Sequence, residues 1–299
     1  MSDEFGKHVK KIKFGPAGKP LNFKGKVEDV PKFLNEKGLT AFEVQQVRQL
    51  NISEEQALKI REEAKKYKIK LSMHGPYAIN LSAEKDEVIQ ASIERLIKAL
   101  KIADLMGADI VVFHPGYYGK SDPKNALKTA LKVLNEIEER AKSLKIKAKL
   151  GAETTGKHSQ LGSLEEIIEM AREIEIVVPV IDFAHLHART LGGFSKKKSY
   201  IEVLDKLESA LGSQEIKNLH IHFSKIEYTQ KGEKKHHPFG SGFGPSFLPL
   251  VEILLERKIN ATIISESPLL DIDALKMKEI AERYAFGKFK TKKELKKLE

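Results

Sequence analysis

The chain has 299 residues, of which 41% are apolar and none is cysteine, and its formal net charge is +10. The apolar fraction is typical of a globular protein. The lack of cysteine excludes disulfides and thiolate metal sites, so any metal must be bound by His, Asp or Glu. No segment approaches the ~18 uninterrupted apolar residues of a membrane span, and the first residues lack the apolar stretch of a signal peptide. We therefore expect a soluble, cytoplasmic protein without membrane association.

The excess of lysine and arginine has two explanations of equal weight. It favours a polyanionic partner such as nucleic acid. It is also typical of the Lys/Glu-rich, solvated surface of a heat-stable protein. Charge alone does not decide between them.

Short β-like segments alternate with longer amphipathic segments along the whole chain. We expect strands at 11–14, 41–47, 70–73, 110–114, 148–153, 177–182, 218–223 and 262–266, and helices at 27–36, 54–67, 83–106, 122–144, 164–174, 200–211, 246–257 and 272–284. Ser53, Ser82 and Ser163 each precede the first turn of an expected helix and are typical N-cap residues. His8 and His158 are expected at the surface.

Eight strands that alternate with eight helices predict an α/β fold, a single (β/α)₈ TIM barrel over residues 1–299, with a lysine-rich tail from about residue 286. The main alternative is an open doubly wound sheet. That fold would need a Gly-x-Gly-x-x-Gly turn after its first strand to bind a nucleotide, and the chain has none there.

Six of the expected strands carry a metal-type ligand near their C-terminal ends: His74, His114, Glu153, Asp182, His220 and Glu266. The C-terminal ends of barrel strands meet at the active-site face, and His185 and His236 follow in loops at the same face. Carboxylates buried together would repel one another unless cations neutralise them. Eight such ligands are too many for one tetrahedral zinc and indicate two or three metal ions. Zn²⁺, Mn²⁺ and Fe all suit His and carboxylate ligands.

Metal ions a few ångströms apart are typical of phosphoester hydrolysis.

Three further histidines lie near the expected ligands. His222 and His187 are each two residues from one and therefore share its face, either as donors that orient a ligand or as polar core residues. His237 adjoins His236 and is either a spare ligand or a phosphate contact.

The ordered set of motifs resembles the endonuclease IV family of apurinic/apyrimidinic endonucleases from about Phe14 to Tyr284. The motifs are His74-Gly75-Pro76-Tyr77, His114-Pro115-Gly116, Glu153-Thr154-Thr155-Gly156, Asp182-Phe183-Ala184-His185, His220-Ile221-His222-Phe223-Ser224-Lys225, His236-His237-Pro238 and Glu266-Ser267-Pro268. The resemblance implies a monomeric zinc enzyme of base excision DNA repair. It would cleave double-stranded DNA 5′ to an abasic site, leaving a 3′-hydroxyl and a 5′-deoxyribose phosphate.

By the same resemblance, three zinc ions are expected in a centre in which Glu153 and Glu266 are catalytic. His74 and His114 would bind the first ion, Glu153 would bridge it to the second, and Asp182, His220 and Glu266 would complete the second site. His185 and His236 would bind the third.

One position departs from the family pattern, because Lys234 stands where an aspartate is usual two residues before the loop histidine. Glu233 could replace that carboxylate if the loop shifts, and otherwise water or His237 would complete the third site.

DNA contacts are expected from Tyr77, which matches a loop that the family inserts into the minor groove, and from Gln45, Gln46, Arg48 and Lys225.

Two other functions remain open. One is a metal-dependent sugar isomerase or epimerase of the xylose-isomerase-like barrels, and the other is a binder of damaged DNA without activity.

Overall fold

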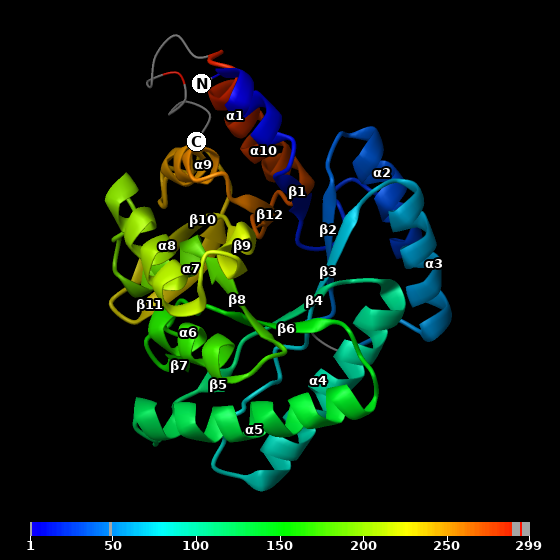
Figure 1. The fold of residues 1–299 in the computed structure, drawn as a ribbon, viewed down its shortest axis with the longest axis vertical. Helices are drawn as coiled ribbons and strands as arrows, with labels where there is room; N and C mark the ends of the chain where they lie inside the picture. Colours follow the sequence, from blue (N-terminus) through cyan, green and yellow to red (C-terminus); the bar gives the residue numbers. More distant parts are fainter. Residues whose placement is uncertain (1, 48–49, 289–293, 295–299) are drawn as a thin grey trace.

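The protein forms a nearly closed barrel of eight parallel strands with helices around it, which confirms the TIM-barrel prediction (Figure 1). The computed structural model describes residues 2–47, 50–288 and 294. The strands are β1 (Lys13–Pro16), β2 (Ala41–Gln45), β3 (Lys70–His74), β4 (Ile110–Phe113), β6 (Lys149–Glu153), β8 (Val177–Asp182), β9 (Asn218–Phe223) and β12 (Asn260–Ser265).

Strands β1 and β2 are the two ends of the sheet, and they meet to close the barrel. The backbone N–H of Thr40 donates to the carbonyl of Phe14 (3.0 Å), and that of Gly18 donates to the carbonyl of Glu43 (2.9 Å). A Cβ atom at Gly15 would lie 1.9 Å from the carbonyl oxygen of Ala41. Closure at this seam therefore requires glycine.

The helices cover the outside of the barrel. They are α1 (Ser2–Val9), α2 (Val30–Glu36), α3 (Glu54–Lys66), α4 (Asp86–Met106), α5 (Pro123–Ser143), α6 (Leu164–Glu173), α7 (Phe183–Arg189), α8 (Lys197–Leu211), α9 (Leu248–Glu256) and α10 (Asp271–Ala285), with short 3-10 turns η1 (Val27–Asp29) and η2 (Glu215–Lys217). No helix in the described part of the chain is both long and apolar enough to cross a membrane.

Two of the three expected N-caps are confirmed. Ser53 and Ser163 accept from the backbone of the third helical residue in capping boxes. The prediction for Ser82 is wrong, because α4 begins at Asp86 and the Ser82 hydroxyl instead donates to the carbonyl of Tyr117 (2.7 Å).

Helix α1 was not expected from the sequence, and it changes the position of His8. The helix lies beside α10 (Figure 1). It buries His8, whose Nε2 lies 2.9 Å from the carbonyl oxygen of Ile259. The expectation of a surface histidine was therefore wrong, because an eight-residue amphipathic helix covers this side of the barrel. The expected lysine-rich tail lies largely outside the described residues.

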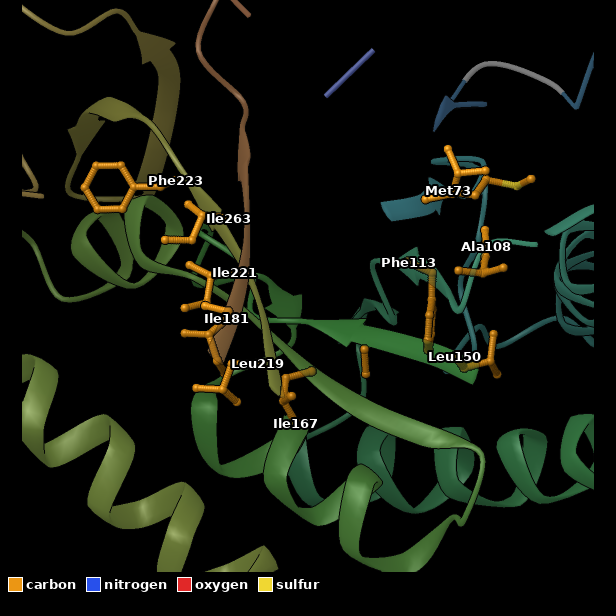
Figure 2. Packing of buried hydrophobic residues seen from close by; sticks show 14 of the residues in the cluster. Met73, Ala108, Phe113, Leu150, Ile167, Ile181, Leu219, Ile221, Phe223 and Ile263 are labelled. Carbon is orange, nitrogen blue, oxygen red and sulfur yellow. The ribbon is translucent and has the colours of Figure 1, made fainter. Parts of the chain in front are cut away.

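Side chains alternate across each barrel strand, which decides what faces the barrel interior. In β9, Leu219, Ile221 and Phe223 belong to the apolar core between sheet and helices, together with Met73, Phe113 and Ile263 of other strands (Figure 2). The intervening residues His220 and His222 consequently point into the barrel.

Two small antiparallel sheets stand at the C-terminal ends of the barrel strands. Strand β5 (Gly116–Tyr117) pairs with β7 (Gln160–Leu161), and β10 (Lys225–Thr229) pairs with β11 (Gly232–His237) directly after β9. The sequence had suggested only a long loop after residue 223. The β10–β11 hairpin carries Lys234, the one position at which the resemblance led us to expect an aspartate.

Candidate metal centre

Three groups of ligand-type side chains meet at the C-terminal mouth of the barrel. Within each group, one ligand atom from every residue lies within 4.8 Å of the others. The first group is His74, His114 and Glu153, the second is Glu153, Asp182, His222 and Glu266, and the third is His185, Glu233 and His236. The convergence expected from the sequence is therefore present, with two differences. His222 takes the place of His220, and Glu233 joins His185 and His236.

Glu153, the last residue of β6, lies at the centre of these groups. Its Oε2 is 2.9 Å from His114 Nε2 and 3.4 Å from His74 Nε2. Its Oε1 is 3.0 Å from His222 Nδ1 and 3.3 Å from His185 Nδ1. One carboxylate thus belongs to the first two groups and also contacts His185 of the third.

Hydrogen bonds to protein oxygens orient three of the histidines. His74 Nδ1 donates to the carbonyl of Gly75 (2.9 Å), and His185 Nδ1 donates to the carbonyl of Thr154 (2.9 Å). His236 Nδ1 lies 2.7 Å from Ser224 Oγ, which gives its own hydrogen to the carbonyl of Lys225. In each ring Nε2 is left facing the site, the arrangement that fixes the tautomer of a metal-binding histidine.

His220 does not join Asp182 and Glu266 as expected, and His222 takes that place. Both residues point into the barrel because they are two positions apart on β9. His222 is nearer the C-terminal end of the strand, where Asp182 and Glu266 lie. His220 is one layer deeper, where its Nε2 is 2.9 Å from Glu43 Oε2.

Glu43 in β2 was missed by the sequence reasoning and is fully buried inside the barrel. Its oxygens accept from Ser72 Oγ (2.9 Å) and lie 3.1 Å from His222 Nε2. The sequence does contain a signal that could have identified Glu43, because its carboxylate lies between Phe42 and Val44 in the middle of an apolar strand.

The third group is assembled by an irregularity in the β10–β11 hairpin. Glu227 pairs with Lys235 and Tyr228 pairs with Glu233, so Lys234 is an extra, unpaired residue in β11. Such a bulge changes which residues share a face of the strand. It places Glu233 on the side of His236, with Glu233 Oε2 3.6 Å from His185 Nε2 and Oε1 3.7 Å from His236 Nε2.

Lys234 points away from the site, because its Nζ donates to Glu227 Oε1 (2.6 Å). The backbone N–H of Glu233 donates to the carbonyl of Gly156 (3.0 Å), which ties the hairpin to the loop after β6. The loop shift considered from the sequence is thus a β-bulge.

Charge and burial compete throughout the centre. Burial would lower the pKa of His222, but the carboxylates of Glu43, Glu153 and Glu266 outweigh it and raise that pKa well above its usual value. Burial would raise the pKa of Glu153, and the charges on His222 and His114 instead hold it well below its usual value. Burial raises the pKa of Glu266 to about 8, and the charges on Glu153 and Asp182 add to this against the charge on His222.

Three buried polar atoms of the centre make no well-aligned hydrogen bond, although each has an oppositely charged or ligand-type neighbour within 3.4 Å: His74 Nε2, Glu153 Oε2 and Asp182 Oδ2. Unsatisfied buried groups of this kind are costly unless something coordinates them. All three atoms belong to the first two groups. Neutral imidazole and carboxylate are the donors that divalent transition metals prefer, so these residues fit a metal centre.

The residues expected to contact DNA have different surroundings. Tyr77 is 53% exposed at the rim, and its ring stacks on that of His114 with centroids 5.7 Å apart. The amide of Gln45 donates to Glu43 inside the barrel (3.3 Å), and that of Gln46 donates to the carbonyl of Gln45 (2.9 Å). Arg48 lies outside the described residues.

Lys225 is buried, and its Nζ donates to the carbonyl of Pro245 (2.8 Å) and lies over the ring of Phe239. Lys225 is therefore not a surface lysine, because β10 turns this side chain into the protein, and its contact with a phosphate stays a prediction.

The remaining histidines lie apart from the three groups. His237 Nε2 is 3.3 Å from Glu227 Oε2, and its ring stacks on Phe243. His187 is buried and its Nδ1 accepts from the backbone N–H of Phe194 (3.2 Å). Burial, with the nearby charge of Lys225, lowers the pKa of His187 to about 4. His158 is exposed, as expected.

Comparison with known proteins places the chain in a family. Residues 31–283 match the xylose isomerase-like TIM barrel family. An uncharacterised protein of Methanocaldococcus jannaschii is 35% identical over 265 residues, which cover 88% of this chain and 94% of that protein. A protein of Thermosipho africanus named probable endonuclease 4 is 30% identical over 230 residues, 73% of this chain and 80% of its own length.

Solved structures show the same fold. Endonuclease IV from Thermus thermophilus matches with a TM-score of 0.67 at 22% identity, over 92% of this chain and 100% of that one. A D-tagatose 3-epimerase-like protein matches with a TM-score of 0.68 at 22% identity, over 87% of this chain and 93% of that one.

Proposed function

The chain belongs to the xylose isomerase-like TIM barrel family, with endonuclease IV proteins among its relatives, and from this premise we propose that it is a metal-dependent endonuclease of DNA repair. Its substrate would be double-stranded DNA with an abasic site. It would hydrolyse the phosphodiester bond on the 5′ side, leaving a 3′-hydroxyl and a 5′-deoxyribose phosphate. Zinc is the proposed metal, with manganese or iron as substitutes.

The observation that carries the proposal is the three adjoining ligand groups around Glu153. Metal ions bound there would lower the pKa of a water molecule and neutralise charge on the phosphate oxygens. A pair or trio of close cations suits a phosphodiester, whose hydrolysis adds negative charge to oxygens on both sides of phosphorus.

The residues of the centre have distinct roles in this proposal. Glu153 would bridge the first two groups, and its contacts with four histidines fix the positions of these side chains relative to one another. Asp182 Oδ1 accepts from the backbone N–H of His185 at the start of α7 (2.8 Å), which leaves Oδ2 facing the site. The side chain of Glu266 is 13% exposed, so it is open to a water molecule at the mouth. Bound cations would lower its raised pKa, and the resulting carboxylate would be placed to take a proton from that water.

Exposed aromatic and basic side chains at the mouth support a nucleic-acid substrate. Tyr77, Tyr228 and Phe243 are 53%, 37% and 39% exposed, and Lys231 and Lys235 of the hairpin are also exposed. Aromatic rings stack on unpaired bases and lysines contact phosphates. Around an abasic site the duplex is weakly stacked, so such rings enter it at low cost.

The test is incubation of the zinc-loaded protein with a 5′-labelled abasic duplex and with the same duplex containing an intact base. We expect incision of the abasic strand alone, with a 3′-hydroxyl end, and loss of incision after prolonged chelation. Glu153→Gln should abolish incision and retain binding of abasic DNA, whereas Glu202→Gln, on the exposed face of α8, should change neither.

Absence of incision with zinc, manganese or iron would refute the proposed activity. Ketose–aldose interconversion or epimerisation in the same preparations would establish the alternative sugar-metabolising function instead. Binding of abasic DNA without either reaction would indicate a non-catalytic binder of damaged DNA.

A further inference from the structure

Beneath the metal centre the barrel holds a second buried cluster, formed by Glu43, Ser72, His220 and His222. All four side chains are buried, and Glu43 and His222 show no exposed surface. A carboxylate at such a depth is very costly unless strong donors surround it. The contacts of Glu43 therefore indicate what the cluster does.

Every hydrogen-bonding position of the Glu43 carboxylate has a donor nearby. Oε2 accepts from Ser72 Oγ (2.9 Å) and from His220 Nε2 (2.9 Å), and Oε1 accepts from the amide of Gln45 (3.3 Å). His222 Nε2 lies 3.1 Å from both oxygens. Four donors from strands β2, β3 and β9 hold the carboxylate in one orientation.

His222 joins this cluster to the metal centre. Its Nε2 faces Glu43, and its Nδ1 faces Glu153 Oε1 (3.0 Å) and Glu266 Oε1 (3.3 Å). A neutral imidazole carries one N–H, and a carboxylate can only accept. A metal ion at the second group would bind the lone pair of Nδ1 in place of a proton, and the one N–H of the neutral ring would then stay at Nε2, held by Glu43.

We propose that Glu43 is a positioning residue, which fixes the ring orientation and the Nε2–H tautomer of His222 so that Nδ1 is a ligand of the second group. The inference rests on the proposed metal centre. His74, His185 and His236 are held by uncharged oxygens of Gly75, Thr154 and Ser224. The nitrogen of His222 that faces away from the second group is held at 3.1 Å by the Glu43 carboxylate, and such a partner makes the other, ligand nitrogen more basic.

The same geometry explains His220, which lies too deep for the second group. Its Nε2 donates to the oxygen that also accepts from Ser72. His220 therefore prevents Glu43 from turning away from His222. It supports the metal centre from one layer below and does not contact it.

A competing explanation is that Glu43, His220 and His222 hold a metal ion of their own, since their ligand atoms lie within 4.8 Å of one another. Their separations of 2.9 to 3.1 Å are those of direct hydrogen bonds. The hydrogen-bonded explanation satisfies every one of these atoms without an ion, and the two explanations predict different metal contents.

The test uses Glu43→Gln in the full-length protein. Glutamine keeps the shape of the side chain but removes the negative charge and one acceptor. Since His222 Nε2 lies 3.1 Å from both oxygens of Glu43, the NH₂ group of the glutamine lies beside this nitrogen in either orientation. A matched control is Glu138→Gln, because Glu138 is also buried and accepts from the backbone N–H of Ile176 on the outer side of the barrel.

Zinc affinity is measured by competition with a chelator, and metal content is measured after dialysis. We expect Glu43→Gln to weaken one zinc site about 10- to 100-fold, the usual effect of losing such a partner, while Glu43→Asp retains part of the affinity. Glu138→Gln should bind zinc as the wild type does, even if its unfolding temperature falls.

Nitrogen-15 spectra of the histidine rings give a readout independent of affinity. The ring signal that disappears in His222→Asn should show the Nε2–H tautomer in the zinc-loaded wild type and should change in Glu43→Gln. An unchanged tautomer and affinity in Glu43→Gln would overturn the inference, as would an equal loss in Glu138→Gln.

Metal content separates the remaining outcomes. Loss of a zinc ion that the wild type binds beyond the three groups would make Glu43 a ligand and would also overturn the inference. A wild-type protein that binds no divalent metal would contradict the proposed function itself.

Discussion

The bulge in β11 makes a specific prediction about the third ligand group. Glu233 supplies its only carboxylate, with oxygens 3.6 and 3.7 Å from the Nε2 atoms of His185 and His236. Glu233→Ala leaves two histidines. Loss of a partner that only orients a ligand costs 10- to 100-fold in metal affinity. Loss of a carboxylate ligand should therefore weaken the third site by at least about 100-fold, which corresponds to roughly 2.8 kcal/mol.

Lys234→Ala is the matched control for this prediction. The Lys234 side chain is 56% exposed and is paired with Glu227 on the far side of the hairpin. Zinc titration monitored by calorimetry should show one site lost in Glu233→Ala and all sites unchanged in Lys234→Ala. If Glu233→Ala binds the third zinc as tightly as the wild type does, or if Lys234→Ala strengthens it, the assignment of Glu233 is wrong.

Three further predictions follow from particular contacts. Gly156→Ala places a Cβ 2.6 Å from Glu233 Cβ and 3.1 Å from His185 Cδ2, so it should lower zinc content at the third group without affecting the first. Tyr77→Ala should weaken binding of abasic duplex by about 5- to 150-fold in a fluorescence-anisotropy titration, since an aromatic–base stack contributes roughly 1 to 3 kcal/mol, with zinc content unchanged. In chelated protein, the raised pKa values of His185, His222 and Glu266, the last about 8, mean that the folded state binds more protons than the unfolded state above pH 6.5. The unfolding temperature should therefore fall from pH 6.5 to 8 and beyond, and saturating zinc should remove this decline. A chelated protein that becomes more stable over that range would contradict the account of the electrostatics.

The barrel and most of the side chains that meet at its mouth could be predicted because their signal is local. An apolar strand that ends in His, Asp or Glu places that residue at the mouth in any parallel barrel. His74, His114, Glu153, Asp182 and Glu266 follow this pattern, and the structure brings them together.

The choice between His220 and His222 could not be made in the same way. Both occupy the inward face of β9, and only the stagger of neighbouring strands decides which layer holds the ligands. In the pairing of β8 with β9, His222 lies opposite Asp182, whereas His220 lies opposite Val180. That register is a property of the assembled barrel and is not visible in the spacing of the two histidines.

Glu233 is a different case, because strand alternation points to the wrong residue. In a regular strand, residue 234 would share a face with His236, and Glu233 would face away. The bulge reverses this, and it depends on the pairing of β10 with β11 and on the close approach of Gly156. Glu43 by contrast had a detectable signal, since a carboxylate in the middle of an apolar strand needs buried partners.

The central claim is that the three groups around Glu153 bind metal ions. Diffraction from a zinc-loaded crystal, measured on both sides of the zinc absorption edge, locates these ions directly. The account predicts one peak beside each of the three groups and none between Glu43 and His220. No peak at Glu153, or a peak at Glu43 in its place, would contradict it.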